Sequence, residues 1–256
     1  AYFLRRAGMD VTLFEKSGAL GGVVRHVIPG FRIPGSAIDK DAALLEKLGV
    51  NICLNSEITD ITMLKNAGYT AVILAVGAYE PGRLKLEKGD AVNALEFLAD
   101  FKTQDGNLDI GKNVVVIGGG NTAMDTARAA KRTKGVEHVY LVYRRTKRYM
   151  PADEEELEMA VEDGVEFMEL LSPVTLETGK LLCKVMKLGD YDASGRRGVV
   201  ETEEEKEIPA DIVIAAVGEK VPTGFYEANG IRVNDRGRAL VSEDTCETSL
   251  AGVYVV

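Results

Sequence analysis

The sequence predicts an α/β fold in which helices cover both faces of parallel sheets, and three observations lead to it. Segments with helical spacing and segments with strand-like spacing alternate along the 256 residues. The apolar strand of YTAVILAVGAYEP (69–81) recurs in ADIVIAAVGEKVP (210–222), with the same Ala-Val-Gly ending and a proline four residues after the glycine. Hydrophobic residues make up 46% of the chain, enough for the core of one large domain or two ordinary ones.

The first part of the chain alternates between helices and strands and ends in a polar stretch. Gly8 and Gly49 close the first two helices, because glycine readily adopts the left-handed conformation that ends a helix. The stretch TQDGNLDIG (103–111) is the candidate domain boundary. Helices are expected over 2–7, 37–48 and 94–102, and strands over 11–14, 50–54 and 69–76.

The second part of the chain begins with a strand, a glycine turn, a helix and another strand, which together predict a parallel βαβ unit. Pro151 and the acids after it favour a helix start, and Gly164 terminates that helix. Short strands then crowd together and predict an antiparallel meander. The βαβ unit covers 113–117, 121–132 and 138–143, the next helix 151–162, the meander 165–171, 181–188 and 199–202, and the last strands 210–217, 230–233, 238–241 and 253–256.

The glycine turn has the pattern GxGxxA, formed by Gly118, Gly120 and Ala123 with Asn121 and Thr122 between them. In a strand–turn–helix context the first glycine allows the tight turn and the second lets backbone amides approach a pyrophosphate. The small Ala123 lets the helix pack on the strand, and the helix N-terminus attracts the anion. This predicts a Rossmann-like dinucleotide site; the alternative is a glycine-rich turn that binds nothing.

A basic loop follows the second strand of this unit, at the position that selects the cofactor. An acid there binds the ribose hydroxyls of NAD, whereas an arginine accommodates the 2′-phosphate of NADP. The chain has Arg144 and Arg145, with Lys147 and Arg148 beside them, in an otherwise acidic protein. We therefore expect NADP(H). The alternative is a solvated loop, or one paired with the acidic run 153–158.

Glu15 ends the strand VTLF, where a dinucleotide fold places its ribose-binding acid. Such an acid lies about 20 residues beyond its glycine loop, so we expect that loop at about position −5, before Ala1. With the internal repeat, this predicts a second dinucleotide-binding unit that is truncated at its start. Taken alone, Glu15 is also compatible with an ordinary acid at a strand end.

Composition excludes several classes of function. The net charge of −9 argues against a general nucleic-acid binder or a membrane-surface binder. The chain has neither an apolar run long enough to span a bilayer nor a secretory signal pattern, which predicts a soluble protein. Three cysteines, Cys53, Cys183 and Cys246, form no close pair and cannot build a disulfide framework or a four-thiolate metal or iron–sulfur site. This suits a reducing cytoplasm.

Acid–base catalysis is not indicated either. His26 and His138 are far apart in the sequence and are expected to be structural rather than metal ligands. No catalytic residue and no metal site is therefore predicted.

The order of motifs resembles a known family. VTLFEK (11–16), LGG (20–22), IPGFRIP (28–34), ILAVGA, VVVIGGGNTAMD, VYRRT, MPADEEE and ADIVIAAVG occur in the order found in the small subunit of glutamate synthase. The same order occurs in the NADPH-reducing part of dihydropyrimidine dehydrogenase and in similar iron–sulfur flavoprotein oxidoreductases. The resemblance covers nearly the whole chain and implies an NAD(P)H-binding domain, 106–224, inserted into a discontinuous FAD-binding domain, 1–105 and 225–256, that is truncated at both ends.

The resemblance also implies roles for particular residues. Glu15 would hold the FAD ribose, with Lys16 beside it also binding the cofactor, and Gly21 and Gly22 would approach the flavin dinucleotide. The 28–34 loop would lie near the flavin, and Gly77 would end the strand that crosses over FAD. The pyrophosphate of NAD(P)H would lie on Gly118, Gly120, Asn121, Thr122 and Ala123, its 2′-phosphate on Arg144 and Arg145, and Gly218 would flank the nicotinamide. The family's FAD glycine loop, its Gly-Asp after the last strand and its amino-terminal cysteine-rich domain are absent from these residues.

By resemblance, hydride passes from NAD(P)H to FAD, and electrons pass on to iron–sulfur clusters elsewhere. The implied partners are an iron–sulfur domain or subunit and an acceptor-reducing domain or subunit. Two alternatives stay open. The chain is a nucleotide-binding piece without activity of its own, or it resembles a flavin disulfide reductase, which needs a redox thiol pair such as CxxC.

Overall fold

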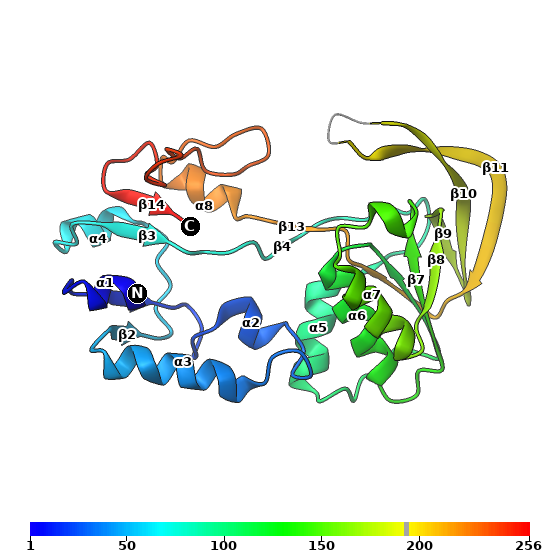
Figure 1. The fold of residues 1–256 in the computed structure, drawn as a ribbon, viewed down its shortest axis with the longest axis horizontal. Coiled ribbons are helices and arrows are strands. Elements are labelled where there is room, and N and C mark those ends of the chain that lie inside the picture. Colours follow the sequence, from blue (N-terminus) through cyan, green and yellow to red (C-terminus); the bar gives the residue numbers. More distant parts are fainter. Residues whose placement is uncertain (192–194) are drawn as a thin grey trace. The chain divides into compact units, whose positions relative to one another are not determined.

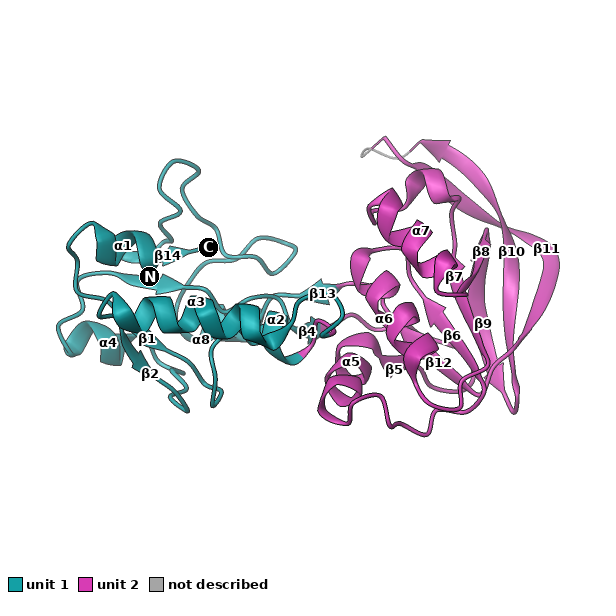
Figure 2. Ribbon diagram, turned by 60° about the horizontal axis from the view of Figure 1, so that its bottom comes forward, with its two compact units in different colours: residues 1–26, 30–80, 219–256 teal, residues 27–29, 81–218 magenta. Residues whose placement is uncertain are grey.

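The computed structural model describes residues 1–191 and 195–256 and divides them into two compact units (Figure 2). Unit 1 comprises 1–26, 30–80 and 219–256, and unit 2 comprises 27–29 and 81–218. The predicted α/β class with parallel sheets is confirmed. The chain changes unit at 80/81 and 218/219, whereas the sequence placed these changes at 105/106 and 224/225. The difference arises because the helix α5 (Ala94–Thr103) packs Phe97 and Leu98 into the core of unit 2.

Unit 2 is built on a five-stranded parallel sheet of order β5-β12-β6-β7-β8 (Figure 2). Its strands are β5 (Val92–Asn93), β12 (Ile212–Ala215), β6 (Asn113–Ile117), β7 (His138–Tyr143) and β8 (Glu166–Glu169). The predicted βαβ unit is confirmed residue for residue, because β6, the helix α6 (Asn121–Arg132) and β7 have the expected bounds. Continuous apolar runs such as those of β6 and β7 are typical of parallel strands that are buried on both faces.

The segment 165–171 was expected to belong to the meander, and this expectation is wrong. Its residues 166–169 form β8, which pairs in parallel with β7 as the fifth strand of the main sheet. Leu170 then adopts a left-handed conformation with φ 58°, which turns the chain before the next strand. The meander itself is a separate antiparallel sheet of order β11-β10-β9, made of β9 (Leu171–Glu177), β10 (Lys180–Tyr191) and β11 (Arg197–Pro209).

The two faces of the main sheet have different covers, which gives unit 2 three layers (Figure 1). Val114 and Val116 pack in the core shared with α5, α6 and α7 (Glu154–Glu162). The alternate residues Val115 and Ile117 pack in a second core that includes Leu181 of the meander. Successive side chains of a strand point to opposite faces, so one strand, β6, contributes to both cores.

An ion cluster joins the two helices α6 and α7. Asp163, which follows α7, accepts hydrogen bonds from Arg128 Nε at 2.7 Å and from Arg132 Nη1 and Nη2 at 2.6 and 2.9 Å. The hydrogen bonds from Arg132 and then from Arg128 outweigh partial burial and hold the pKa of the Asp163 carboxyl below its ordinary value. The cluster therefore fixes α7 on α6 beside the sheet.

Replacing Asp163 by alanine is expected to lower the free energy of unfolding by about 2 kcal/mol, since charge-assisted hydrogen bonds to two arginines are lost. The folded-state pKa of Asp163 is lowered, so its contribution is complete above the unfolded-state pKa and disappears as pH falls through the folded-state value. Urea unfolding at pH 7 and pH 3 measures both effects. The matched control is Glu162→Ala, an exposed neighbour. Equal losses in the two variants would contradict the assignment.

Unit 1 holds two separate parallel strand pairs. The strand β1 (Thr12–Phe14) pairs with β2 (Asn51–Cys53), and β3 (Val72–Leu74) pairs with β14 (Val253–Val255). The weak strand signals at 230–233 and 238–241 meet only in a bridge between Val233 and Ala239. Its helices are α1 (Tyr2–Arg6), α2 (Gly22–His26), α3 (Gly35–Lys47), α4 (Thr62–Asn66) and α8 (Thr223–Ala228), and the short strands β4 (Glu80–Pro81) and β13 (Glu219–Lys220) pair where the chain changes unit.

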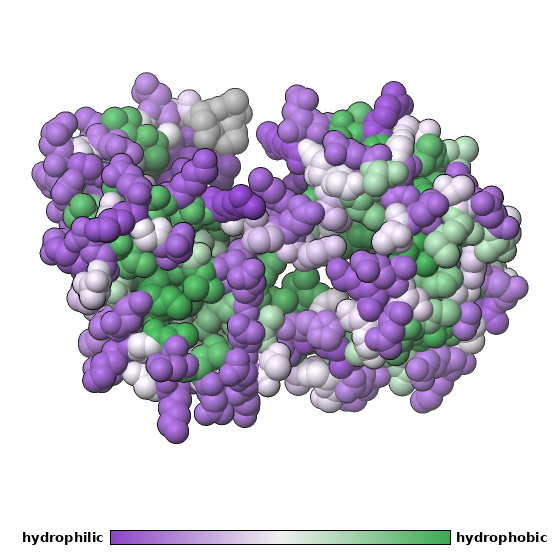
Figure 3. Space-filling model, turned by 180° about the vertical axis from the view of Figure 1, so that it is seen from behind, coloured by the Kyte–Doolittle hydropathy of each residue, from purple (hydrophilic) through white to green (hydrophobic). Residues whose placement is uncertain are grey.

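The surface mixes hydrophilic side chains with smaller apolar areas (Figure 3). In unit 1, Ile73 in the middle of β3 is 46% exposed, and Phe3 of α1 is 82% exposed. The strands of unit 1 are thus only partly covered by the residues of this chain.

Among the described residues, no helix is both long and apolar enough to cross a membrane.

Candidate functional site

The glycine turn lies between the end of β6 and the start of α6. Gly118 has φ +157°, and a Cβ atom on it would collide with the carbonyl oxygen of Ala216 and lie 3.0 Å from Cβ of Ala123. The small Ala123 is itself fully buried. The helix can therefore start close to the ends of β6 and β12 only because both positions lack bulk.

The other two glycines of the turn differ from each other. A Cβ on Gly119 would lie 2.5 Å from the ring of Tyr143, whereas a Cβ on Gly120 would meet nothing nearer than Cγ of Pro151 at 3.9 Å. Gly120 is the N-cap of α6, with φ −98° and ψ 175°, and the first turn of the helix holds no acid and no side-chain cap. The backbone before this helix N-terminus is open, and its donors suit an anion such as a pyrophosphate.

Two of the predicted pyrophosphate ligands have partners within the protein. The side chain of Asn121 faces Asp153: Asn121 Nδ2 donates to Asp153 Oδ2 at 3.2 Å, and the Asp153 backbone N–H donates to Asn121 Oδ1 at 3.2 Å. The carbonyl of Thr122 accepts from Thr126 Oγ1 at 2.6 Å. Asn121 is thus used in a contact that the sequence motif does not indicate.

The basic loop between β7 and α7 holds the predicted 2′-phosphate ligands. Arg144 is exposed and forms no hydrogen bond or ion pair with another described side chain. Arg145 is half-buried, and its Nε donates to the carbonyl of Arg197 in β11 at 2.8 Å. Arg144 is therefore the side chain of the pair that is placed to reach a ligand, while Arg145 also fastens the loop to the meander.

The rest of this loop contains the short 3₁₀ helix η1 (Lys147–Tyr149). Lys147 Nζ lies 3.9 Å from Glu154 Oε1, and the guanidinium of Arg148 lies 6.0 Å from the ring centre of Tyr149. The alternative that the basic loop pairs with the acidic run 153–158 thus accounts for Lys147 and leaves Arg144 as a candidate phosphate ligand.

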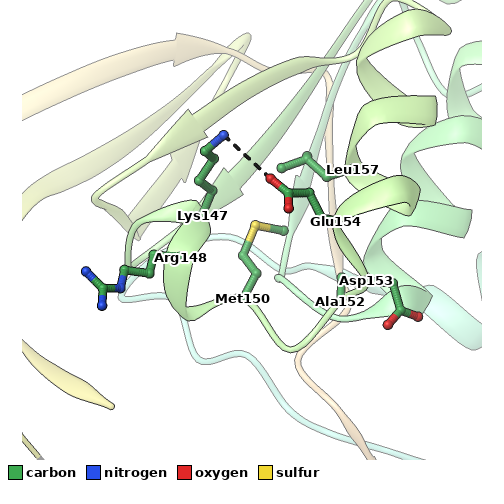
Figure 4. A pocket seen from close by; sticks show the side chains of 7 residues that line it. All are labelled: Lys147, Arg148, Met150, Ala152, Asp153, Glu154 and Leu157. Carbon is green, nitrogen blue, oxygen red and sulfur yellow. Dashed lines mark ion pairs between the residues drawn. The ribbon is translucent and has the colours of Figure 1, made fainter.

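An open pocket of about 420 Å³ lies between η1 and the start of α7 (Figure 4). Lys147 and Glu154 point toward each other across it, while the head groups of Arg148 and Asp153 point away from that ion pair. The pocket is lined by Lys147, Arg148, Met150, Ala152, Asp153, Glu154 and Leu157. Unit 2 therefore combines an open helix N-terminus, a basic loop and a neighbouring hollow.

The candidate residues of unit 1 lie after β1 and around the start of α2. Glu15 Oε1 accepts the backbone N–H of Ser17 at 2.8 Å, which closes a turn at the strand end. The ammonium of Lys16 lies 4.1 Å from the ring centre of Tyr79, within the range of a cation–π contact. Glu15 therefore has a local structural role that is compatible with, and does not require, a bound ribose.

The candidate glycines of unit 1, and Gly218 after β12, also differ in their surroundings. Gly21 has φ +121°, and a Cβ on it would lie 2.9 Å from Cγ2 of Ile38, so close packing against α3 excludes a side chain. Around Gly22, Gly77 and Gly218 a Cβ would meet no atom within 4 Å. These backbone positions are open to an approaching ligand.

The three cysteines are all free. Cys183 is buried between the sheets of unit 2, and desolvation raises the pKa of its thiol to about 12, so it stays protonated at neutral pH. Cys53 and Cys246 belong to unit 1, where Cys53 is half-buried and Cys246 is exposed. The chain therefore offers no preformed thiol pair for disulfide exchange.

The chain was compared with protein families and with individual proteins. The family model for pyridine nucleotide-disulphide oxidoreductases matches residues 1–256. The putative oxidoreductase YgfK of Escherichia coli strain K12 is 42% identical over 260 residues, which cover 100% of this chain and 25% of that protein. The putative glutamate synthase [NADPH] small chain of Cereibacter sphaeroides is 34% identical over 275 residues, which cover 99% of this chain and 66% of that protein.

A solved structure shares the fold. FprA of Mycobacterium tuberculosis in complex with NADPH has a TM-score of 0.78 at 20% identity, covering 99% of this chain and 74% of that one. The chain thus spans between a quarter and two thirds of the length of the two sequence relatives, and it shares its fold with a protein solved with NADPH.

Proposed function

The chain belongs to the pyridine nucleotide-disulphide oxidoreductase family, and from this premise we propose that it is the NADPH-oxidising, flavin-binding part of a longer oxidoreductase. The resemblance to the small subunit of glutamate synthase is confirmed. Members of the family are oxidoreductases that use NADP(H) and flavin. The observation that carries the proposal is the open N-terminus of α6 at Gly120, followed by the basic loop at Arg144.

NADPH is proposed to bind to unit 2. Its pyrophosphate lies on the backbone of Gly118 and Gly120 and on the first turn of α6, where unfilled N–H donors and the helix dipole stabilise negative charge. Its 2′-phosphate lies on the basic loop, with Arg144 as the main ligand and Arg145 beside it. Gly218, whose surroundings are open, flanks the nicotinamide.

FAD is proposed to bind to unit 1. Glu15 and Lys16, at the end of β1, hold its ribose, and the open backbone at Gly22 and Gly77 lies against the dinucleotide. Gly21, which has no side chain, allows the start of α2 to pack closely against α3.

In this proposal the chain's residues bind and orient the cofactors rather than transfer protons. When bound, the nicotinamide and the flavin supply the redox chemistry themselves, with a hydride passing from one to the other. The proposed partners are an iron–sulfur domain or subunit, which would take up the electrons, and an acceptor-reducing domain or subunit, which would use them. The small chain of glutamate synthase, by its name one chain of a larger enzyme, supports a partner of this kind.

A second candidate function is nucleotide binding without turnover. It is favoured by unit 1, where the parallel strands form two separate pairs, β1–β2 and β3–β14, and Ile73 in β3 is 46% exposed. A dinucleotide-binding sheet is normally continuous, so the flavin site is the less complete of the two.

Anaerobic titration of the purified protein with NADPH separates the two functions. The first predicts a yellow protein whose oxidised-flavin absorption band at about 450 nm is bleached by about one equivalent of NADPH. The second predicts a colourless protein that still binds NADPH. A protein that binds neither nucleotide contradicts both, and addition of FAD before the titration controls for flavin lost during purification.

A further inference from the structure

Four hydrogen bonds join the basic loop and its end to the glycine turn and to β7. Tyr143 Oη donates to the carbonyl of Tyr149 at 2.8 Å, and the backbone N–H of Ala152 donates to the carbonyl of Gly119 at 3.0 Å. The remaining two are the reciprocal bonds between Asn121 and Asp153, both at 3.2 Å. We call the Asn121–Asp153 pair the clasp. It connects the first residue of α6 with the residue just before α7.

The side chain of Asp153 does not form the hydrogen bond that is usual at its position. Asp153 is the N-cap of α7, where an aspartate normally accepts a backbone N–H of the first turn and so stabilises the helix by about 1 kcal/mol. Here no such cap hydrogen bond forms, and the carboxylate bonds across to Asn121 instead. The Asp153 carboxylate therefore does not cap its own helix and instead contacts Asn121, which lies 32 positions away in the sequence.

The distance between the two phosphate-binding segments matters for cofactor choice. NADPH and NADH share the pyrophosphate and differ in the 2′-phosphate, so NADPH is preferred only if the basic loop lies at a fixed distance from the glycine turn. The bonds of Tyr143 and Ala152 also tie this loop down, but the clasp connects a side chain at the start of α6 directly with a side chain just before α7.

We propose that Asn121 and Asp153 act as a positioning pair that holds the basic loop in register with the glycine turn and so sets the preference for NADPH over NADH. This inference rests on the proposed function, because it assigns the basic loop to the 2′-phosphate. Asp153 acts through the position of the basic loop and is not itself a ligand.

A simple charge effect changes the preference for NADPH in the direction opposite to loss of the clasp, which makes the inference testable. Asp153 is an acid beside a site for anions, so removing its charge by itself strengthens NADPH binding more than NADH binding, because NADPH carries the extra phosphate. Removing the clasp weakens NADPH binding more than NADH binding. The ratio of the two dissociation constants, Kd(NADH)/Kd(NADPH), separates the effects, since changes at the shared pyrophosphate cancel.

The test compares Asp153→Ala, which removes the charge and the side-chain half of the clasp and keeps only the backbone N–H of residue 153 as a donor to Asn121, with Asp153→Asn, which removes the charge but keeps an oxygen that accepts from Asn121. Glu155→Ala is the matched control, because Glu155 is an exposed acid in the first turn of the same helix. We expect Asp153→Ala to lower the ratio roughly five-fold, a typical loss for one hydrogen bond, and the other two variants to leave it unchanged or raise it by no more than about two-fold. A ratio that is unchanged or raised in Asp153→Ala, or lowered equally in Asp153→Asn, overturns the proposal.

A second readout does not depend on the cofactor. The basic loop holds four trypsin sites at Arg144, Arg145, Lys147 and Arg148. Loss of the side-chain bond of the clasp is expected to speed cleavage in this loop several-fold in Asp153→Ala and not in Asp153→Asn or Glu155→Ala. Cleavage at the parent rate in Asp153→Ala also overturns the proposal.

The two measurements distinguish the possible failures. If the parent protein shows no preference for NADPH, the assignment of the basic loop in the proposed function fails, and the inference about preference fails with it. If the parent prefers NADPH and Asp153→Ala keeps that preference, only the inference fails. A thermal scan of each variant confirms that unit 2 remains folded.

Discussion

Replacing Arg144 and Arg145 together by glutamate is expected to weaken NADPH binding on the order of 100-fold while NADH binding changes by less than about three-fold. The reason is that the 2′-phosphate loses charge-assisted hydrogen bonds and meets two negative charges, whereas NADH has no group at that position. Fluorescence titration of the purified protein with each cofactor measures both constants, and the loss of NADPH affinity should shrink at high salt.

The single variants of this pair should differ. Arg144 is exposed, whereas Arg145 donates Nε to the carbonyl of Arg197, so Arg144→Glu is expected to carry the larger share of the NADPH loss. The double reversal Lys134→Glu with Lys187→Glu, at exposed sites in unit 2 outside the basic loop, is the control for net charge. Equal losses of affinity for NADPH and NADH, or a loss of NADPH affinity of the same size in the control, would contradict the 2′-phosphate assignment.

The second large effect concerns the glycine turn and separates packing from binding. Gly118→Ala is expected to lower the free energy of unfolding by roughly 3 kcal/mol, because its Cβ collides with the carbonyl of Ala216 at a backbone conformation that suits glycine. Gly120→Ala should change stability by less than about 0.5 kcal/mol, because its φ of −98° is open to alanine and its Cβ meets no close atom.

The effects of the two glycine variants on cofactor affinity should not follow their effects on stability. In Gly120→Ala the new methyl group occupies the space through which the pyrophosphate approaches the backbone, so we expect NADPH and NADH affinity to fall together by about ten-fold or more. Urea unfolding and cofactor titration of both variants provide the two measurements. A Gly118→Ala protein as stable as the parent, or full binding by Gly120→Ala, would show that the turn has another role.

The βαβ unit was predictable because its signals are local. The apolar run over 113–117, the glycines after it and the helical spacing over 121–132 each specify one element, and all three agree. The position of α5 was not predictable in the same way. Its sequence shows a helix, but only the core around Phe97 and Leu98 decides which unit it joins.

Other features depend on contacts that no short pattern encodes. The strand β8 continues into β9 in sequence, and only the left-handed Leu170 separates a parallel strand from the meander. The helices α2, α4 and α8 are five or six residues long, too short for a periodic signal. The Asn121–Asp153 pair joins two motifs that the sequence marks separately, and the acid before EEE signals only a helix start.

The pairing of β3 with β14 has a consequence for the order in which the chain folds. Val72 pairs with Val253, so this strand pair of unit 1 cannot form until residue 253 has been synthesised. Nearly all of unit 2 is continuous in sequence from 81 to 218, and the backbone N–H of Gly82 meets the carbonyl of Gly218 at 2.8 Å. On the ribosome, where domains form as their sequence emerges, unit 2 is complete while β3 still waits for its partner. The pairing of β3 with β14 is therefore expected to follow the folding of unit 2.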